Sequence, residues 1–446
     1  MDVQISMETT FDDGTKRTHQ LGGLSRPYRL AQQEGLGLLL EDAKAILRHI
    51  QKAVLSDQIE EVCSVNRTCP DCGCRRAIHD YRERVFDTVF GRFRQRSPRI
   101  RRCKCYDCGG VLSPLAQFFP DRATPELRRL QTELGARHSF REAARIMELF
   151  LPCAKQMNTT IRNRLGQVAH EIGGSKPTEM DLDEQAISPP LTVFLDGAHI
   201  RCRPEYQRRH LDVVVGKIES PNMCRRFGLV SQAARSPAKQ LRADLSALGW
   251  DGERTVTVIS DGEVALPNLV RNAVKGPVRH ILDWWHISMR VRHVENAVKG
   301  LLQAKDFMGI PEFFKRPSES LRWHLWHGKI MTAGTNLQWL MTDCARLPKD
   351  NMAVSEAAKR VEARCKELYT YLDNNFEALT DYGWRYRNGF PISSSRAEGC
   401  VDDICNSRMG KRRRMRWSPR GAHCVAVTRA AVLDGRLNVS HRAMAA

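Results

Sequence analysis

The sequence predicts an α/β domain that is interrupted by a block of helices and preceded by smaller modules. From about His286 to Leu379, apolar residues recur only at helical spacing, and no strand pattern resumes before the C-terminal stretch. A chain of 446 residues is long enough for two or three domains. The α/β interpretation depends on five apolar, β-branched runs, which are "LTVFLDGAHIRC", "HLDVVVGKI", "RRFGLVSQ", "TVTVISDG" and "VRHILDWW".

Changes in composition divide the chain into six predicted segments. The first contains a helical pattern from about Tyr28 to Val62, and the second is rich in Cys and Arg. The segments are a helical N-terminus at 1–62, a cysteine-rich module at 63–122, a helical pair at 123–180, the first part of the α/β core at 181–286, a helical insertion at 287–380, and the last part of the core with a basic C-terminal helix at 381–446.

Charge and composition narrow the classes of function. The net charge is +19, and the most common partner of so basic a chain is the phosphate backbone of a nucleic acid, although a basic enzyme of another kind is the alternative. The first residues lack the pattern of a secretion signal, and no stretch has the roughly 18 apolar residues of a membrane helix. Fifteen cysteines without such a signal predict reduced thiols in a cytoplasmic, soluble protein.

The cysteine-rich module contains two short metal-binding patterns. Cys69 and Cys72 form one C-x-x-C pair, and Cys105 and Cys108 form a second. Two such pairs supply a tetrahedral sulfur site for a structural Zn²⁺, with Cys74 or Cys103 as substitutes for one ligand. Four sulfurs leave no open position, so a catalytic zinc is not expected; the alternative is a set of free buried thiols.

Two successive helical patterns follow the cysteine-rich module. "SFREAARIMELFL" and "NTTIRNRLGQVAHEI" fit a helix-turn-helix arrangement, with Ser139 capping the first helix and Glu142 closing a capping box. Arg162, Asn163 and Arg164 fall on the exposed face of the second helix and suit contacts with bases and phosphates. An ordinary antiparallel helix pair is the alternative.

Two strands of the predicted sheet end in an acidic residue. Asp196 follows "LTVFL" and Asp261 follows "TVTVIS", and Gly comes after each. Asp-Gly is also a common hairpin turn, so either residue alone says little. Both in one α/β domain predict two carboxylates that lie side by side and share a divalent metal ion through oxygen ligands.

A third acid lies before a run of basic residues. Glu398 is a candidate third ligand, whereas the alternative is a capping box with Ser395, and Asp402 is the rival ligand one turn later. Three carboxylates can hold two Mg²⁺ ions about 4 Å apart for phosphoryl transfer. A helix starting near Ser395 would place a cationic run beside the acids, where it can bind DNA phosphates. The run comprises Arg408, Lys411, Arg412, Arg413, Arg414 and Arg416.

The motifs "FLDGAHI", "ISDGE", "HILDWWHISMRV" and "SSSRAEGCVDDICNSRMGKRRRMRW" resemble those of bacterial insertion-sequence transposases of the DDE class, in particular the ISKra group. The resemblance implies a ribonuclease H-like core with Asp196, Asp261 and Glu398 as the catalytic triad. "DWWH" is similar to a D-x-x-H element of related enzymes and implies an accessory role for Asp283 and His286. The alternative for these two residues is a strand end and a helix cap.

The resemblance also implies an activity and partners. The expected enzyme binds double-stranded DNA at the terminal repeats of its element, cuts with Mg²⁺ or Mn²⁺ to free a 3′ hydroxyl, and joins that hydroxyl to target DNA. It is expected to act as a homo-oligomer on paired ends, near the nucleoid of a bacterial cytoplasm. The alternatives are a zinc-containing DNA-binding regulator without catalysis and a nuclease of the same fold that does not join strands.

Overall fold

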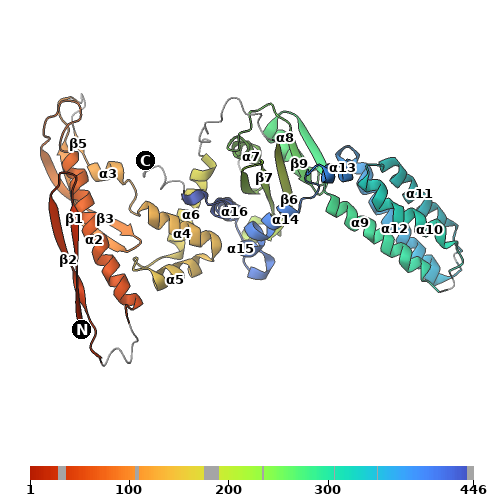
Figure 1. The fold of residues 1–446 in the computed structure, drawn as a ribbon, viewed down its shortest axis with the longest axis horizontal. Coiled ribbons are helices and arrows are strands. Elements are labelled where there is room, and N and C mark those ends of the chain that lie inside the picture. The colour runs from red at the N-terminus through yellow and green to blue at the C-terminus, as the bar shows by residue number, and fades with distance from the viewer. Residues whose placement is uncertain are drawn as a thin grey trace. The chain divides into compact units, whose positions relative to one another are not determined.

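The computed structural model is a mixed α/β structure whose polypeptide divides into two compact units (Figure 1). One unit comprises residues 1–168 with 437–446, and the other comprises 169–436. None of the described helices is both long and apolar enough to cross a membrane. The structure describes residues 1–28, 37–105, 110–174, 190–233, 236–305, 307–348 and 350–438.

The first unit begins with a β-hairpin that packs against a long helix. Strands β1 (Asp2–Thr10) and β2 (Lys16–Ser25) pair antiparallel, and helix α2 (Leu40–Val65) contacts both. The prediction of a helical segment over 1–62 is therefore wrong for the hairpin. Its side chains alternate between exposed and partly buried along β1, which is the period-two pattern of a strand. The start of the predicted helix, residues 29–36, lies outside the described residues.

Asp57 on α2 holds the hairpin to the helix. The residue is 3% exposed, and its carboxylate accepts hydrogen bonds from Thr9 Oγ1 (2.7 Å) and Arg17 Nη1 (3.0 Å) and lies 2.8 Å from His19 Nε2. Burial raises the pKa of Asp57, but the hydrogen bonds from Thr9 and His19 outweigh it and place the pKa below its usual value. The stabilisation from a lowered carboxyl pKa is complete above about pH 4 and is lost as the pH falls through the lower value.

We expect Asp57→Ala to lower the free energy of unfolding of this region by about 2 kcal/mol, because it leaves the partly buried donors Thr9, Arg17 and His19 without their shared acceptor. Hydrogen exchange of α2 peptides in the full-length protein at pH 7 measures the loss. Glu60→Ala is the matched control, since Glu60 pairs with the same Arg17 from the same helix but is 60% exposed. Its effect should stay below about 1 kcal/mol. Equal protection in the Asp57→Ala variant and the wild type would contradict this role.

The cysteine-rich module forms a three-stranded antiparallel sheet of order β3-β4-β5. The strands are β3 (Ile78–Thr88), β4 (Gly91–Arg101) and β5 (Val111–Leu112). Phe86 and Phe93 face α2 and pack with Leu55 and Ile59. The sheet therefore has a small apolar core on one side only, and the loops at its ends carry the cysteines.

After the short helix α3 (Pro114–Phe118), the first unit continues with α4 (Pro125–Arg137), α5 (Phe140–Phe150) and the larger part of α6 (Asn158–Gly174). The Ser139 hydroxyl accepts a hydrogen bond from Glu142 N, so the predicted cap of α5 is present. Helix α4 approaches α6 closely at Gly135, where a Cβ would lie 2.8 Å from Ile161 Cγ2. The predicted helix pair is thus part of a small helical cluster.

The second unit is built on a five-stranded sheet of order β10-β9-β6-β7-β8. The first three strands along the chain form an antiparallel meander, and β9 and β10 run parallel to β6. All five predicted strands are present, as β6 (Leu191–Arg201), β7 (His210–Glu219), β8 (Cys224–Val230), β9 (Val256–Ser260) and β10 (Val278–Leu282).

Helices cover both faces of this sheet. Side chains along β6 alternate between the two faces, and Val193 and Leu195 pack with helices α7 (Pro237–Ser246) and α8 (Ala265–Val274). On the opposite face, helix α16 (Pro419–Leu433) contacts β8. A Cβ at Gly228 of β8 would lie 3.1 Å from Ala426 Cβ, so Gly allows this helix to approach.

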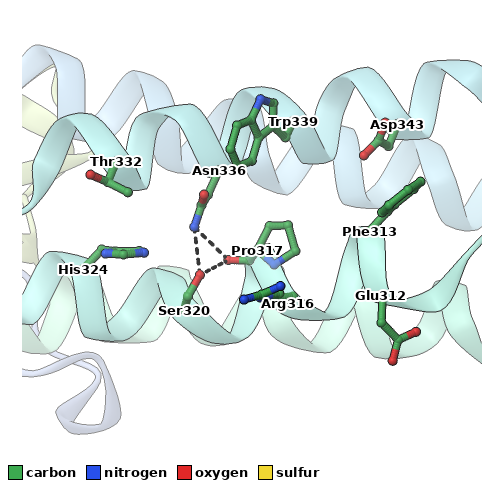
Figure 2. A pocket seen from close by; sticks show the side chains of 10 residues that line it. All are labelled: Glu312, Phe313, Arg316, Pro317, Ser320, His324, Thr332, Asn336, Trp339 and Asp343. Carbon is green, nitrogen blue, oxygen red and sulfur yellow. Dashed lines mark hydrogen bonds between the residues drawn. The ribbon is translucent and has the colours of Figure 1, made fainter.

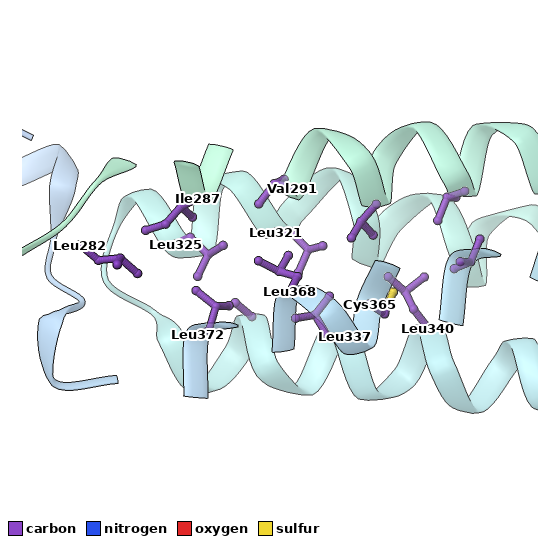
Figure 3. Packing of buried hydrophobic residues seen from close by; sticks show 14 of the residues in the cluster. Leu282, Ile287, Val291, Leu321, Leu325, Leu337, Leu340, Cys365, Leu368 and Leu372 are labelled. Carbon is purple, nitrogen blue, oxygen red and sulfur yellow. The ribbon is translucent and has the colours of Figure 1, made fainter. Parts of the chain in front are cut away.

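The helical insertion, predicted at 287–380, consists of α9 (Trp284–Leu302), α10 (Pro311–Trp326), α11 (Ile330–Arg346) and α12 (Met352–Asn374). The short helix α13 (Tyr382–Arg387) follows it. Val291, Leu321 and Leu368 form the buried centre of the insertion, and Leu282 of β10 continues the same apolar cluster (Figure 3). The insertion and the sheet therefore share one core rather than joining through a flexible linker.

The chain returns to the sheet through a helix with an irregular centre. Helix α14 (Ser395–Cys400) runs into a π-helical turn at Val401–Asn406 and then into α15 (Ser407–Met409). π-helical turns are rare in proteins overall, and those that occur are often found at functional sites. The basic run does not continue this helix as predicted, because the helix ends before Gly410 and Arg414 adopts a positive φ of 51°.

Candidate active site and cysteine cluster

Strand register brings three aspartates to one edge of the sheet. The last parallel pair of β6 and β9 joins Phe194 with Ile259, so Asp196 lies two residues further along β6 and Asp261 lies just after the end of β9, two residues beyond Ile259. Parallel strands are about 4.8 Å apart, which makes these two carboxylates neighbours. Leu282 of β10 pairs with Ser260, so Asp283, directly after β10, falls at the level of Asp261, directly after β9. Strand β6 does not end at Asp196 but continues along β7 to Arg201.

The ionisation of Asp196 depends on the other predicted site residues. Burial raises the pKa of its carboxyl to about 6, while a hydrogen bond from Gly197 N (2.7 Å) opposes the rise. The negative charges of Asp261 and Glu398 raise this pKa further, and His286 lowers it. These side chains are therefore close enough to influence one another, and a bound cation would relieve the repulsion between the three carboxylates.

Contacts from the neighbouring segments hold Asp261 in place. Its Oδ1 accepts a hydrogen bond from Glu263 N (3.0 Å), and its backbone carbonyl accepts one from the Tyr371 hydroxyl (2.8 Å) on α12. Gly262 turns the chain sharply after the strand with a φ of 90°. The helical insertion thus contacts the strand end that carries one of the three acids.

Glu398 does not close the predicted capping box. The N-cap of α14 is Ser394 rather than Ser395, and its side chain makes no capping hydrogen bond. Glu398 lies in the exposed part of the first helical turns. The rival ligand, Asp402, lies on the π-helical turn, where it accepts a hydrogen bond from Asn406 Nδ2 (2.7 Å). The structural alternative for Glu398 is thereby removed, and its carboxylate is available for another role.

Asp283 and His286 are linked to each other as the D-x-x-H pattern suggests. Asp283 is the N-cap of α9, accepts from Trp285 N (2.7 Å), and lies 3.1 Å from His286 Nδ1. Asp283 raises the pKa of His286, and Asp261 adds to this rise. Asp283 therefore caps a helix, as the alternative interpretation predicts, and the accessory role of Asp283 and His286 stays a prediction.

Four cysteines come together beside the three-stranded sheet. The Sγ atoms of Cys69, Cys72, Cys103 and Cys105 all lie within 4.8 Å of one another. Two of them precede β3 and two follow β4. The fourth member of this group is Cys103, whereas the predicted set has Cys108, which lies outside the described residues. The C-x-C spacing of Cys103 and Cys105, directly after a strand, is the signal that could have identified this pair.

Backbone geometry prepares the first pair of cysteines for a metal ion. Gly73 turns the chain with a φ of 68°, and its N–H donates to the carbonyl of Cys69 (2.9 Å). Hydrogen bonds, the strongest from the Cys72 backbone N–H and others from Cys103 and Asp71, lower the pKa of the Cys69 thiol to about 6, which favours the thiolate that binds metal. Four sulfur ligands suit tetrahedral Zn²⁺ with no position left for substrate. The cluster can therefore hold a structural zinc.

Two of the predicted DNA-contacting arginines have structural partners instead. Arg164 forms a two-point ion pair with Asp121 that includes an Nη2–Oδ1 hydrogen bond of 2.7 Å. Its guanidinium group is therefore already paired within the protein and does not point to solvent for a contact with DNA bases. Arg408 is 3% exposed, lies 4.9 Å from the centre of the Trp417 ring, and has its pKa lowered to about 10 by burial. Helical spacing alone places both on exposed faces, because it reveals neither the partner of Arg164 on a distant segment nor the end of the helix that lets Trp417 fold back onto Arg408.

The other predicted DNA-binding residues that the structure describes are exposed to solvent. Arg162 and Asn163 are exposed on α6. In the C-terminal run Arg412, Arg413, Arg414 and Arg416 are exposed, while the side chain of Lys411 lies outside the described part. The run lies in the loop between α15 and α16 and not on a helix that continues from α14.

The insertion carries a pocket of about 620 Å³ between α10 and α11 (Figure 2). Inside it Asn336 Nδ2 donates to Ser320 Oγ (2.8 Å) and to the carbonyl of Pro317 (3.3 Å). Phe313 and Trp339 line it, and none of the predicted site residues does. The pocket is therefore separate from the three acids.

The fold and these clusters define a mixed α/β protein with a cysteine cluster suited to zinc and an acidic edge on its larger sheet. No family model matches the chain, and no curated protein matches it.

Proposed function

We propose that this protein is a DNA transposase of the DDE class with a ribonuclease H-like core. The observation that carries the proposal is the placement of Asp196 on β6 and of Asp261 directly after β9, each two residues beyond the Phe194–Ile259 pair of these parallel strands. Glu398 also contributes to the raised pKa of Asp196. The sheet order, with its second strand antiparallel to the others, supports the proposed fold.

Asp196, Asp261 and Glu398 would hold two Mg²⁺ or Mn²⁺ ions, because carboxylate oxygens are the ligands that these ions prefer. When bound, such ions stabilise charge on the scissile phosphate and lower the pKa of water at neutral pH. The protein positions the phosphodiester for hydrolysis that frees a 3′ hydroxyl. The same site then directs that hydroxyl onto a phosphate of target DNA, where one P–O bond forms as another breaks.

The other modules supply the proposed DNA contacts. The zinc-binding module and Arg162 and Asn163 of α6 would recognise the terminal repeats, and the exposed arginines of the C-terminal run would bind phosphates. A homo-oligomer would hold two element ends together. The net charge of +19 supports the DNA contacts, and the homo-oligomer is proposed from the resemblance alone.

The exposed basic run should contribute to DNA affinity through its charge. Replacing Arg412, Arg414 and Arg416 with Ala should reduce the slope of log K against log salt by about 2–3, because each lost phosphate contact removes about 0.9. Fluorescence anisotropy with duplex DNA across a salt series measures the slope. A control with Arg346, Arg360 and Arg364 replaced by Ala removes the same charge from ion pairs in the insertion. An equal change in both triple variants would contradict a specific role.

Incubation of the full-length protein with Mg²⁺ and labelled DNA that carries the ends of its element tests the proposal. The expected products are a cut with a 3′ hydroxyl at the element end and a joined product with target plasmid. Binding without metal-dependent cleavage would favour a regulator, and cleavage without joining would favour a nuclease. Either of these outcomes would overturn the proposed transposase.

A further inference from the structure

The carboxylate of Asp283 joins separate parts of the fold at the acidic edge. The residue is 0% exposed and begins α9, where its Oδ1 accepts from Trp285 N. Its Oδ2 lies 3.1 Å from His286 Nδ1 and accepts a hydrogen bond of 2.5 Å from the Ser394 hydroxyl. Both carboxylate oxygens are therefore engaged by the protein, which distinguishes Asp283 from the three proposed metal ligands.

Ser394 occupies an N-cap but does not use its hydroxyl as a cap. It is 2% exposed, and its backbone carbonyl accepts from Ala397 N (2.6 Å) and Glu398 N (3.2 Å). Ser139 and Ser418 cap their helices with their side chains, whereas the Ser394 hydroxyl is directed to Asp283 instead. Without the side-chain hydrogen bond of an N-cap, a helix is less stable by about 1 kcal/mol. The Ser394 hydroxyl therefore stabilises the contact with Asp283 and not the start of its own helix.

Backbone contacts tie the same two segments together. Asp283 N donates to the carbonyl of Ser260 at the end of β9 (3.0 Å), and Trp284 N donates to the carbonyl of Ile392 (3.0 Å). The Tyr382 hydroxyl donates to the carbonyl of Leu282 (2.9 Å). The first and last residues of the insertion thus meet at the strand ends that carry the acids.

We propose that the hydrogen bond between Ser394 and Asp283 positions Glu398 against Asp196 and Asp261. Glu398 lies one helical turn after Ser394 and donates its backbone N–H to that residue, so the anchor fixes the helix start that carries the carboxylate. Ser394 and Asp283 are positioning residues, and the helical insertion is a rigid support of the site. This inference rests on the proposed function, which makes Glu398 a metal ligand.

Ser394→Ala in the full-length protein tests this role, with Ser395→Ala as the control because Ser395 is the adjacent, exposed serine. Electron paramagnetic resonance measures the affinity of the protein for Mn²⁺. The Mn²⁺ binding that is lost in Glu398→Gln defines the binding component that belongs to the proposed site. We expect Ser394→Ala to weaken that component about 10-fold and to reduce DNA cleavage about 10–100-fold, with recovery at higher Mn²⁺. The melting temperature should change by less than about 5 °C. Ser395→Ala should behave as the wild type.

A second pair of variants separates the hydroxyl from the shape of the side chain. Ser394→Thr should restore Mn²⁺ binding, and Ser394→Val, which has the shape of Thr without the hydroxyl, should not. Unchanged Mn²⁺ binding in Ser394→Ala and Ser394→Val would overturn the inference, even if the wild type cleaves DNA. Weakened Mn²⁺ binding with a wild type that never cuts DNA would support the positioning role while the transposase proposal fails.

Discussion

Replacement of Asp196 by Asn should abolish DNA cleavage and strand transfer, with a rate at least about 10³-fold below that of the wild type. Asn keeps the shape of the side chain but removes the charge that a divalent ion requires. Burial already makes the carboxylate of Asp196 costly to ionise, with a pKa of about 6, and the nearby charges of Asp261 and Glu398 add to that cost. Such an arrangement is unfavourable unless a cation neutralises it.

Glu398→Gln should have an effect of the same size, and Asp402→Asn should leave cleavage close to the wild-type rate. Asp402 is the matched control because it is also an acid on the same irregular helix and already accepts a hydrogen bond from Asn406. Quantitative cleavage assays at saturating Mg²⁺, with DNA binding measured separately, check this prediction. If Asp402→Asn loses activity and Glu398→Gln retains it, the third metal ligand is Asp402, one turn further along the helix, and not Glu398.

Removal of the metal ion from the cysteine cluster should unfold the small sheet that carries it. Its apolar core is limited to one face, whereas a structural zinc contributes about 10 kcal/mol or more to the folding of small domains. Cys69→Ser and Cys103→Ser should each lose the zinc and the protection of β3 and β4 against hydrogen exchange. Cys74→Ser should keep both, because Cys74 is not among the four clustered sulfurs.

Native mass spectrometry of the full-length protein measures the zinc content, and hydrogen exchange after chelation measures the protection. One zinc per chain is expected. Cys108→Ser tests the ligand that sequence spacing proposed, and it should retain zinc if Cys103 completes the quartet. A wild type without zinc, whose exchange does not respond to a chelator, would contradict the assignment.

The sequence predicted the larger sheet well because its strands are buried on both faces. Val193, Leu195 and Val258 belong to nearly continuous apolar runs, which are typical of strands covered by helices on both sides. Strand register places Asp196 and Asp261 each two residues beyond the Phe194–Ile259 pair, and their sharing of a metal ion stays a prediction. Helical spacing also predicted the insertion, whose buried residues recur along each helix.

Local patterns were insufficient where distant segments decide the structure. The N-terminal hairpin is stabilised by α2, through contacts such as that of Thr9 with Asp57, and its strands are too exposed to show a strong apolar pattern. Helical spacing directs Arg164 and Arg408 to DNA, but Arg164 pairs with Asp121 of a distant segment, and Arg408 packs on Trp417 because the helix ends between them. The link from Ser394 to Asp283 joins residues 111 positions apart, so no local motif contains it.

The central claim is that Asp196, Asp261 and Glu398 hold divalent metal ions together. Crystals of the full-length protein grown with Mn²⁺ and measured at the manganese absorption edge test this claim directly. We expect anomalous peaks bound by all three carboxylates at the edge of the five-stranded sheet. Saturating Mn²⁺ with no peak at these carboxylates, or a peak that Glu398 does not touch, would contradict it.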